Sequence, residues 1–426
     1  MRIVCGPSTP TVDTLDADLK VLLYGRQVPP GYGSAGAAIA EKLRRKKLSP
    51  TPRAWDFLSI ALAVTAADLA GHRNRSSDGW TREFNLTLAV AEPKFWTTQV
   101  ATLQELLSFL TTDRWTIGFI PGAPNLDSPA QPIYPENDCA VLLSGGLDSF
   151  TGALDLVARG HSPLAVSQSV RGDAAKQRSL AGLIGGGLAH IQLNHNSEVP
   201  DPESPPTQRA RSIAFLAYGV LTATALRRHA DGGSVPLFVC ENGFIALNPP
   251  LTGSRLGSLS TRTCHPVVLR LLQRLLDEAD LRVRLENPCA YLTKGEMLVG
   301  AACQDLLRQY AHETTSCGRF KRHGYRHCGR CVPCLIRRSA FHCRGVADRT
   351  EYVYSDLSID DLEHARSDDV RAAAIAVAEA ADIGVERWLG ATLSSPLLGR
   401  SVQQLREVAS RGLTEIGSFL EFSCVR

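Results

Sequence analysis

The sequence predicts an α/β protein, and three features of its 426 residues support this fold class. Apolar runs of strand length alternate with helical runs from about residue 139 to about residue 240, a pattern typical of βαβ units that build a parallel sheet. A glycine-rich turn, SGGLDS, directly follows the first of these runs. Two proline-rich segments separate or interrupt the runs, and the length favours two or three domains.

The composition is that of an ordinary globular protein, with 44% hydrophobic residues, 21% charged residues and a formal net charge of +3. This balance does not indicate a nucleic acid or membrane partner. The longest strongly apolar stretch, Phe57 to Thr65, is about half as long as a bilayer span, and the first residues contain no signal-peptide core. We therefore expect a cytoplasmic protein without membrane or nucleic acid partners.

The first 120 residues read as an accessory α/β domain. Its expected elements are a helix near Ala54 to Ala70, a strand in REFNLTLAVA, a helix in QVATLQELLSFL and a strand in WTIGFI. Five prolines then follow between Pro121 and Pro135. Because proline at this density is incompatible with the interiors of helices and sheets, we place the accessory domain at 1–120 and a linker at 121–137.

A second domain with a parallel sheet is expected at 138–344. Its expected strands are CAVLLSG, PLAVSQS, HIQLN and PLFVC, and its helices end near Arg159, span about 174–184, and run from Arg211 to His229. The proline-rich segment EVPDPESPPTQ is expected to form a mobile surface loop. After Val346, DDVRAAAIAVAEAAD and SVQQLREVASRGLTEIGSFLEF place apolar residues at three-and-four spacing, which predicts a helical extension over 345–426.

The turn SGGLDS has the features of an anion-binding loop. Gly145 and Gly146 allow backbone N–H groups to approach an anion closely, Ser144 and Ser149 offer hydroxyl donors, and a helix N-terminus follows. Asp148 would be repelled by a phosphate unless it held a magnesium ion. The helix is indicated by apolar residues at 3-4-3 spacing and a glycine at its expected end: Leu147, Phe150, Leu154, Val157 and Gly160. The alternative is a tight turn in which Ser or Asp caps the helix.

Other phosphate motifs are weaker or missing. No G-x-x-x-x-G-K-[ST] sequence occurs, which argues against P-loop chemistry at a γ-phosphate. GYGSAG at 31–36 matches the dinucleotide-binding G-x-G-x-x-G pattern but follows two prolines instead of a strand. No acid ends a second strand about 20 residues later, so we do not expect a dinucleotide there.

Four of the twelve cysteines are clustered in SCGRFKRHGYRHCGRCVPC. Cys317, Cys328, Cys331 and Cys334 are separated by ten, two and two residues. Four thiolates with no open position suit a structural zinc ion. An iron–sulfur cluster and four reduced thiols are the alternatives.

The same segment offers substitute ligands and positive charge. If one thiolate were not used, the available substitutes are His323, His327, Cys343 and His342. Seven Arg or Lys and no acid occur from Cys317 to Arg338. They indicate either an anion nearby or charges that balance the thiolates.

Two of these motifs together carry a family resemblance. SGGLDS after a buried strand resembles the PP-loop of ATP pyrophosphatases, which release pyrophosphate and leave AMP on a substrate. Together with C-x10-C-x2-C-x2-C and Arg337-Arg338, it resembles the QueC family of 7-cyano-7-deazaguanine synthases over about residues 138–344. The resemblance implies a Rossmann-like PP-loop domain with a zinc site, and the cofactors ATP, Mg²⁺ and Zn²⁺. It also implies that 7-carboxy-7-deazaguanine is adenylated, converted by ammonia to an amide, and activated again to give a nitrile.

The resemblance also assigns roles to residues. QRARSIAFLA is similar to a helix start of the family, which places Arg209 and Arg211 near the substrate, and TKGEM places Lys294 near the ATP phosphates. We take Asp148, Lys294 and Arg211 as catalytic candidates and Glu241 as a further substrate-binding candidate. Glu241 and His265 are the candidates for a general base. The expected ATP-binding residues are Ser144, Gly145, Gly146, Leu147, Asp148 and Ser149.

The chain departs from the family in two segments and in length. The family's Tyr-Gly-Gln is replaced by VSQSVRGDAAKQ, and its Tyr-Pro-Asp-Cys-Arg is missing near CENGFIALNPPL and STRTCHP. Residues 1–135 and about 345–426 are additions, and this enlarged plan resembles the QueC-like proteins of antiphage defence systems. That branch implies adenylation of a deazaguanine carboxylate with a protein amine as acceptor in place of ammonia. It also implies a protein partner bound through the added domains.

Three other functions stay open at this point. The chain would be a housekeeping synthase of queuosine biosynthesis if it released a free nitrile. It would be a PP-loop enzyme that modifies tRNA bases if its ATP turnover depended on RNA. It would be a nucleotide-binding scaffold that no longer reacts if it bound ATP without releasing pyrophosphate.

Overall fold

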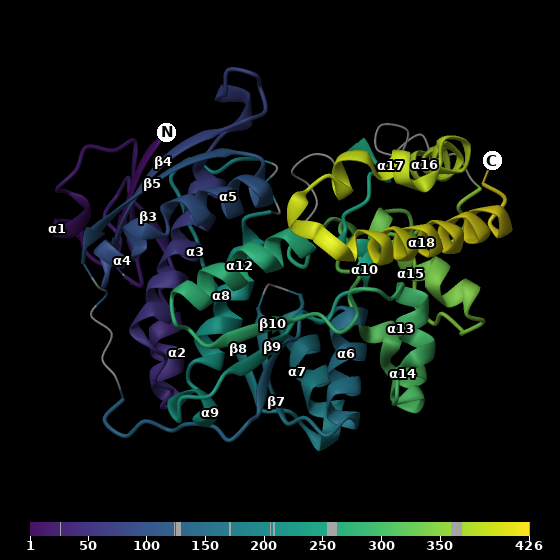
Figure 1. Cartoon of the computed structure of the whole chain (residues 1–426), viewed down its shortest axis with the longest axis horizontal. Coiled ribbons are helices and arrows are strands. Elements are labelled where there is room, and N and C mark those ends of the chain that lie inside the picture. The colour runs from purple at the N-terminus through teal and green to yellow at the C-terminus, as the bar shows by residue number, and fades with distance from the viewer. Residues whose placement is uncertain are drawn as a thin grey trace.

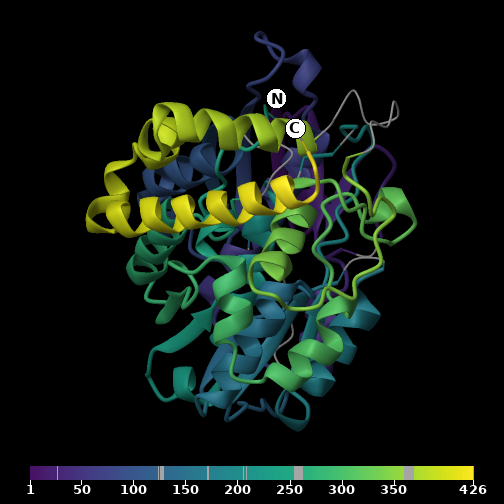
Figure 2. The same cartoon turned by 90° about the vertical axis from the view of Figure 1, so that its right-hand side faces the viewer.

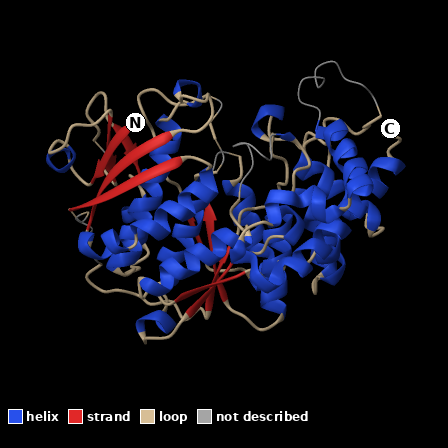
Figure 3. Ribbon diagram, turned by 45° about the horizontal axis from the view of Figure 1, so that its top comes forward, coloured by secondary structure: helices blue, strands red, loops and turns tan. Residues whose placement is uncertain are grey.

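The computed structural model describes residues 1–25, 27–122, 124, 129–169, 172–204, 206–207, 209–253, 262–358 and 369–425. It confirms the α/β fold class: two five-stranded sheets, parallel throughout, pack against helices (Figures 1 and 3). The expected four-cysteine cluster and the expected C-terminal helices are also present.

The first sheet is built by the N-terminal part of the chain in the order β3-β2-β1-β4-β5. Its strands are β1 (Arg2–Gly6), β2 (Leu19–Leu23), β3 (Gly33–Ala35), β4 (Glu83–Val90) and β5 (Arg114–Pro121). The helices of this part are α1 (Thr9–Val12), α2 (Ile39–Arg45), α3 (Pro52–Ala70), α4 (Pro93–Thr98) and α5 (Val100–Thr111).

The second sheet has the order β10-β9-β6-β7-β8. Its strands are β6 (Cys139–Leu142), β7 (Pro163–Gln168), β8 (His190–Leu193), β9 (Val235–Phe238) and β10 (Val283–Glu286). The helices between these strands are α6 (Leu147–Ala158), α7 (Ala174–Leu183), α8 (Arg211–Ala223), α9 (Arg227–Ala230), α10 (Gly243–Ala246) and α12 (Pro266–Glu278).

Both sheets follow the same path. In each sheet the first strand along the chain lies in the centre, the next two strands are added on one side, and the last two are added on the other side. The direction reverses between β1 and β4 in the first sheet and between β6 and β9 in the second. In parallel sheets, a ligand crevice forms outside the carboxyl ends of the strands at such a reversal.

Helices α3 and α8 pack against each other between the two sheets (Figure 1). Most of α3 is buried on all sides because it contacts β2, β3 and β4 as well as α8. This explains why its sequence is apolar all round instead of along one stripe. One continuous set of buried apolar side chains therefore reaches from the first sheet into the second.

The remaining helices form a group beside the second sheet. They are α13 (Lys294–Gly300), α14 (Gln304–Tyr310), α15 (Val332–Cys343), α16 (Asp369–Ile383), α17 (Val385–Leu389) and α18 (Val402–Phe422). The long helix α18 packs along α15 and also contacts α10 and α16 (Figure 2).

Several sequence expectations need correction. The expected helix from Arg211 to His229 ends at Ala223, and the Arg227 N–H instead donates to the Pro135 carbonyl at 2.9 Å. The strands β1 to β3 and β10 were not expected. Gly33–Ala35 of the GYGSAG segment is an edge strand.

The proline-rich segment after Glu198 is anchored to the first sheet, although a mobile loop was expected. Glu198 and Ser34 exchange two backbone hydrogen bonds at 2.8 and 2.9 Å, and Thr207 donates to the buried Asp68. The predicted linker at 121–137 thus lies between the two sheets in the sequence, but these contacts join the two parts of the chain in space. The domain limits stay a prediction.

Candidate active site

The glycine-rich turn joins β6 to α6. Gly145 adopts a left-handed φ of 88°, and a Cβ added at Gly146 would lie 3.2 Å from Ser144 Oγ. The Oγ atoms of Ser144 and Ser149 are 3.0 Å apart, and Ser144 Oγ accepts a hydrogen bond from the Gly146 N–H at 3.2 Å. Within the described residues, no side chain caps the first turn of α6. Its backbone N–H groups and the two hydroxyls therefore form an arrangement suited to a phosphate.

Asp148 lies in the first turn of α6, where it is buried and has both carboxylate oxygens engaged. Oδ1 forms an ion pair with the buried Lys294 ammonium. Oδ2 accepts a hydrogen bond from Asn242 Nδ2 at 2.7 Å. Lys294 opens α13, and Asn242 follows β9 and caps α10. Residues from three separate segments therefore meet where the strand order reverses.

The structure thus brings together Asp148 and Lys294, which the sequence proposed for one site. Asn242 was missed. Its only sequence signal is an Asn a few residues after a buried strand, and this signal is equally typical of a helix cap. It serves as that cap too, because its Oδ1 accepts the Ile245 N–H at 3.0 Å.

Helix α18 holds the start of α13 in place. Thr293 and Glu296 form a capping box around the first turn. Thr293 Oγ1 donates to the buried Glu415 of α18 at 2.5 Å, and Arg411 of α18 forms an ion pair with Glu296 at 2.7 Å. Burial raises the pKa of Glu415. The C-terminal extension therefore supports the residues on both sides of Lys294.

The four clustered cysteines are arranged like ligands of one metal ion. Their sulfur atoms lie within 4.8 Å of one another, and Cys317–Cys331 and Cys328–Cys334 are separated by 3.8 and 3.9 Å. A tetrahedron with metal–sulfur bonds of about 2.3 Å has edges of about 3.8 Å. The backbone N–H groups of Arg319 and Cys328 donate to Cys317 Sγ at 3.3 Å each. This donor set fits a closed zinc centre.

The substitute ligands lie outside this cluster. His327 Nε2 accepts the Ser316 N–H at 3.1 Å, and the Cys343 thiol donates to the Glu415 carbonyl at 3.3 Å. His342 packs against Phe422 with 4.4 Å between ring centroids. The His323 ring stands edge-on to Tyr354 at 5.9 Å.

The cysteine cluster is connected directly to the glycine-rich turn. The Thr315 N–H donates to the Gly145 carbonyl at 2.8 Å. The fully buried Arg337 donates to Thr314 Oγ1 at 2.8 Å and to Ser316 Oγ at 3.1 Å. A metal ion held by the cysteines would thus fix the segment that covers Gly145.

Three of the seven positive charges around the cysteines have partners that the structure shows. Arg319 pairs with Asp369 at 3.0 Å, Arg337 is buried as described, and Arg338 donates to the carbonyls of Gly329, Tyr354 and Ser355. These three arginines therefore stabilise the fold around the cysteine cluster.

Helix α7 supplies further residues beside the turn. Gln177 Nε2 donates to the Ser144 carbonyl at 3.0 Å, and its Oε1 accepts from Gln192 Nε2 at 2.9 Å. Lys176 Nζ lies 3.5 Å from Thr315 Oγ1, and burial lowers its pKa. The sequence gave no sign of these contacts because they join segments separated by up to 139 residues.

The predicted substrate residues differ in exposure. Arg209 is fully buried. Arg211, at the start of α8, is partly exposed, and burial lowers its pKa while the nearby Asp173 opposes this effect. Burial raises the pKa of Asp173. Arg211 is therefore the better placed of the two arginines for a ligand.

The two base candidates lie in different settings. The Glu241 carboxylate hydrogen-bonds to the Cys264 thiol, whose pKa is raised by burial and next by this carboxylate. His265 caps α12, since its Nδ1 accepts the Val267 N–H at 3.2 Å. Burial lowers the pKa of His265 to about 3. The capping bond occupies His265 Nδ1, so Glu241 stays the base candidate of the two.

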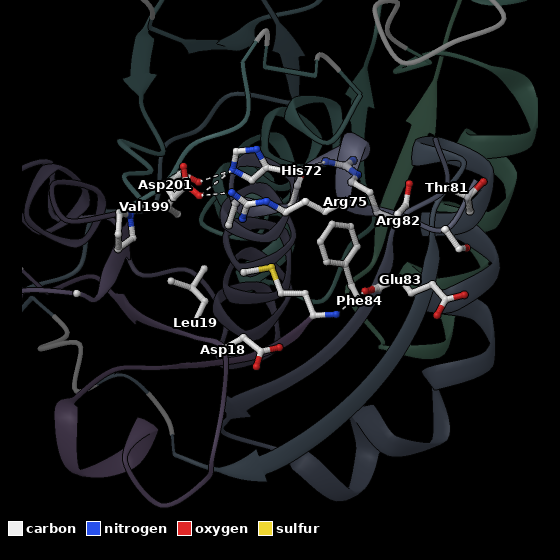
Figure 4. A pocket seen from close by; sticks show the side chains of 17 residues that line it. Asp18, Leu19, His72, Arg75, Thr81, Arg82, Glu83, Phe84, Val199 and Asp201 are labelled. Atoms are coloured by element: carbon white, nitrogen blue, oxygen red, sulfur yellow. Dashed lines mark hydrogen bonds and ion pairs between the residues drawn. The ribbon is translucent and has the colours of Figure 1, made fainter. Parts of the chain in front are cut away.

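A cavity of about 610 Å³ lies at the end of the first sheet where its strands begin, opposite their carboxyl ends (Figure 4). His72 and Arg75 on its wall approach Asp201 at 3.3 and 2.9 Å. These contacts tie the proline-rich segment to the first sheet. The cavity is thus separate from the glycine-rich turn.

The fold and the site define an α/β protein with a glycine-rich turn suited to an anion at a strand-order reversal and a four-cysteine cluster that can bind a metal. Residues 262–345 match the family model of the queuosine biosynthesis protein QueC. A 7-cyano-7-deazaguanine synthase of Paracoccus denitrificans is 27% identical over 237 residues, which cover 51% of this chain and 94% of that protein. The synthase of Agrobacterium fabrum is 29% identical over 249 residues, covering 51% of this chain and 92% of that protein.

A shorter match is more similar. The Rhizobium meliloti synthase is 38% identical over 92 residues, covering 21% of this chain and 36% of that protein. No solved structure matches the chain. The comparisons confirm the resemblance to the QueC family over about half of the chain. No helix in the described part of the chain combines the length and hydropathy of a bilayer crossing.

Proposed function

We propose that this chain uses ATP to adenylate the carboxylate of a deazaguanine, releases pyrophosphate, and transfers the activated acyl group to an amine. The observation that carries the proposal is the meeting of the SGGLDS turn, Asp148 and Lys294 at the strand-order reversal of the second sheet. The relatives, named 7-cyano-7-deazaguanine synthases, support the choice of a deazaguanine substrate.

In the first step, the N-terminus of α6 and the hydroxyls of Ser144 and Ser149 would bind the ATP phosphates. A carboxylate oxygen of the substrate attacks the α-phosphorus, and the bond from that phosphorus to the bridging oxygen breaks. The electron pair leaves with pyrophosphate, and Lys294 offsets the charge that develops there. Arg211 would bind the substrate.

Asp148 must change partners for this step. Its two oxygens already bind Lys294 and Asn242. We infer that Lys294 moves from Asp148 to the phosphates when ATP binds, while Asn242 keeps the carboxylate in place. Asp148 then has an oxygen available for Mg²⁺, which supplies positive charge to the phosphates when bound.

In the second step, an amine attacks the carbonyl of the acyl-adenylate, the bond to AMP breaks, and the amine loses a proton. Glu241 is the proposed proton acceptor because it directly precedes Asn242, whose side chain contacts Asp148. Ammonia as acceptor gives an amide that a second activation converts to a nitrile. A protein amine gives a stable conjugate instead.

The test is pyrophosphate release from ATP and Mg²⁺, measured with and without 7-carboxy-7-deazaguanine, followed by mass spectrometry. A free 7-cyano product identifies the housekeeping reaction, and a mass increase on a protein N-terminus identifies conjugation. ATP binding without release under every condition would leave a scaffold. Release that depends on RNA instead of the deazaguanine would indicate a tRNA-modifying enzyme, and either of these results would overturn the proposal.

We further propose a role in antiphage defence and a protein partner for the added segments. The length supports this, since about half of the chain lies outside the match to the synthases. Phage plating on cells that express the wild-type chain with its neighbouring genes, compared with Asp148→Asn, tests the role. Equal plaque numbers would contradict it.

A further inference from the structure

A cationic groove lies between α2 and the outer strand of the second sheet. Its volume is about 490 Å³, and it is lined by four cations and no acid: Lys42, Arg45, Lys46 and Arg178. Leu188 and Ile191 add apolar surface. The residues of the SGGLDS turn do not line it, so the groove is separate from the candidate active site.

Most of this positive charge has no acidic partner. Of the four groove cations, only Arg45 forms an ion pair with a described residue, and its partner is Glu41 at 2.6 Å. Lys42 Nζ and Arg178 Nη1 both donate to the neutral Gln192, at 3.1 and 2.9 Å. The groove therefore keeps an excess of positive charge.

The positive charge of the groove also acts on His190, which lines it. Burial first, and then Lys46 and Arg178, lower its pKa to about 4, so the ring is neutral at physiological pH. Its Nε2 lies 2.8 Å from Ser167 Oγ. Cations from the first part of the chain and from α7 thus act on the same small region.

We propose that this groove binds a small anion with two or more phosphate groups. Arginine and lysine side chains around a concave surface are the groups that recognise phosphates, and the volume lies in the range of small-molecule sites. A protein that binds a nucleic acid duplex along its backbone can make about six to ten phosphate contacts. Four cations in one short groove fit a compact ligand better. This proposal does not depend on the proposed adenylation.

The test uses the full chain and inorganic tripolyphosphate, with backbone hydrogen exchange as the local readout. We expect slower exchange in peptides covering 39–47 and 188–193. The double variant Lys46→Ala/Arg178→Ala should need at least about tenfold more tripolyphosphate for the same protection, since it removes two cations that can form charge-assisted hydrogen bonds to phosphate. The matched control Arg114→Ala/Arg274→Ala removes two exposed cations elsewhere and should behave as wild type.

The possible results separate cleanly. Protection confined to the turn at 144–149, or equal protection in the double variant, would overturn the proposal. Equal protection by sulfate at matched ionic strength would show unspecific attraction of anions and overturn it too. Protection by a single-stranded oligonucleotide but not by tripolyphosphate would assign the groove to nucleic acid instead.

Discussion

The two sheets have the same strand order, yet only the second carries a candidate site at its reversal. There, a turn with two glycines and two serines leads into a helix of 12 residues whose N-terminus is free of side-chain caps in the described structure. In the first sheet, β1 runs into a helix of four residues, α1. A helix of this length has too few aligned peptide groups to favour an anion as α6 does.

The buried acids at the two reversals also differ. Asp148 contacts the Lys294 ammonium group and the Asn242 amide, which come from distant segments. Asp56, beside the end of β4, accepts hydrogen bonds from the Ala91 N–H at 2.8 Å and Trp96 Nε1 at 2.9 Å. Its partners are fixed parts of the fold. The comparison teaches that the same strand order can hold an acid bound by nearby backbone and indole donors or an acid bound by side chains from distant segments.

The sharpest test of this difference compares Asp148→Asn with Asp56→Asn. Asp148→Asn should lower pyrophosphate release by about 1,000-fold or more, because magnesium and Lys294 lose their charged partner. Circular dichroism should show a folded protein. Asp56→Asn should lower the free energy of unfolding by about 1–3 kcal/mol, since it places an amide N–H₂ against fixed donors. Its activity per folded molecule should be unchanged, and retained activity in Asp148→Asn would break the distinction.

The second prediction concerns the zinc ion that the four cysteines beside the glycine-rich turn of the second sheet are expected to bind. Cys328→Ser should remove the zinc and, through the Thr315–Gly145 hydrogen bond, weaken ATP binding by about 100-fold. Elemental analysis should find one zinc per wild-type chain and much less in the variant. Cys5→Ser, a buried cysteine of the first sheet, is the control and should keep the zinc. Undiminished ATP affinity in the zinc-free variant would contradict the coupling.

The third prediction sharpens the role of α18. Arg411→Ala removes the ion pair with Glu296 and a hydrogen bond to the Tyr291 carbonyl at 2.8 Å. We expect kcat to fall by about tenfold, with a change of less than about threefold in the KM for ATP, because Lys294 is less well oriented. Arg406→Ala, which removes an ion pair with Glu386 at 2.6 Å, is the control on the same helix. Equal effects of the two variants would mean that α18 only stabilises the fold.

The prediction with the smallest expected effect concerns His265 at the junction between the sheets. The centroid of its ring lies 4.8 Å from that of Phe109. Its pKa is about 3 in the folded protein, below the ordinary value of 6.5. The unfolded chain binds the proton first, so stability falls as the pH drops below about 6.5. The loss from this group should be about 1 kcal/mol between pH 7 and pH 5.5. His265→Asn, which keeps a cap, should reduce the slope in urea titrations, and an unchanged slope would contradict the assignment.

The sequence was most informative where a local pattern carries the structure. The turn at Ser144 to Ser149 and the four cysteines were found because their residues are neighbours in the chain. Strands β1 to β3 were missed because each has five or fewer residues and lacks a clear alternation. Asn242, Gln177 and Thr315 act through contacts with distant segments, which no local pattern encodes. Their roles and those of the other site residues stay predictions.

The anchoring of the segment after Glu198 has a consequence for how the chain folds. This segment is inserted between β8 and α8 of the second sheet, yet it pairs with Ser34 and binds Asp68 of the first part. Neither half can complete its own contacts alone. The chain should therefore unfold in one cooperative transition, and a fragment cut at the predicted linker would leave an exposed apolar surface on α8 that favours aggregation.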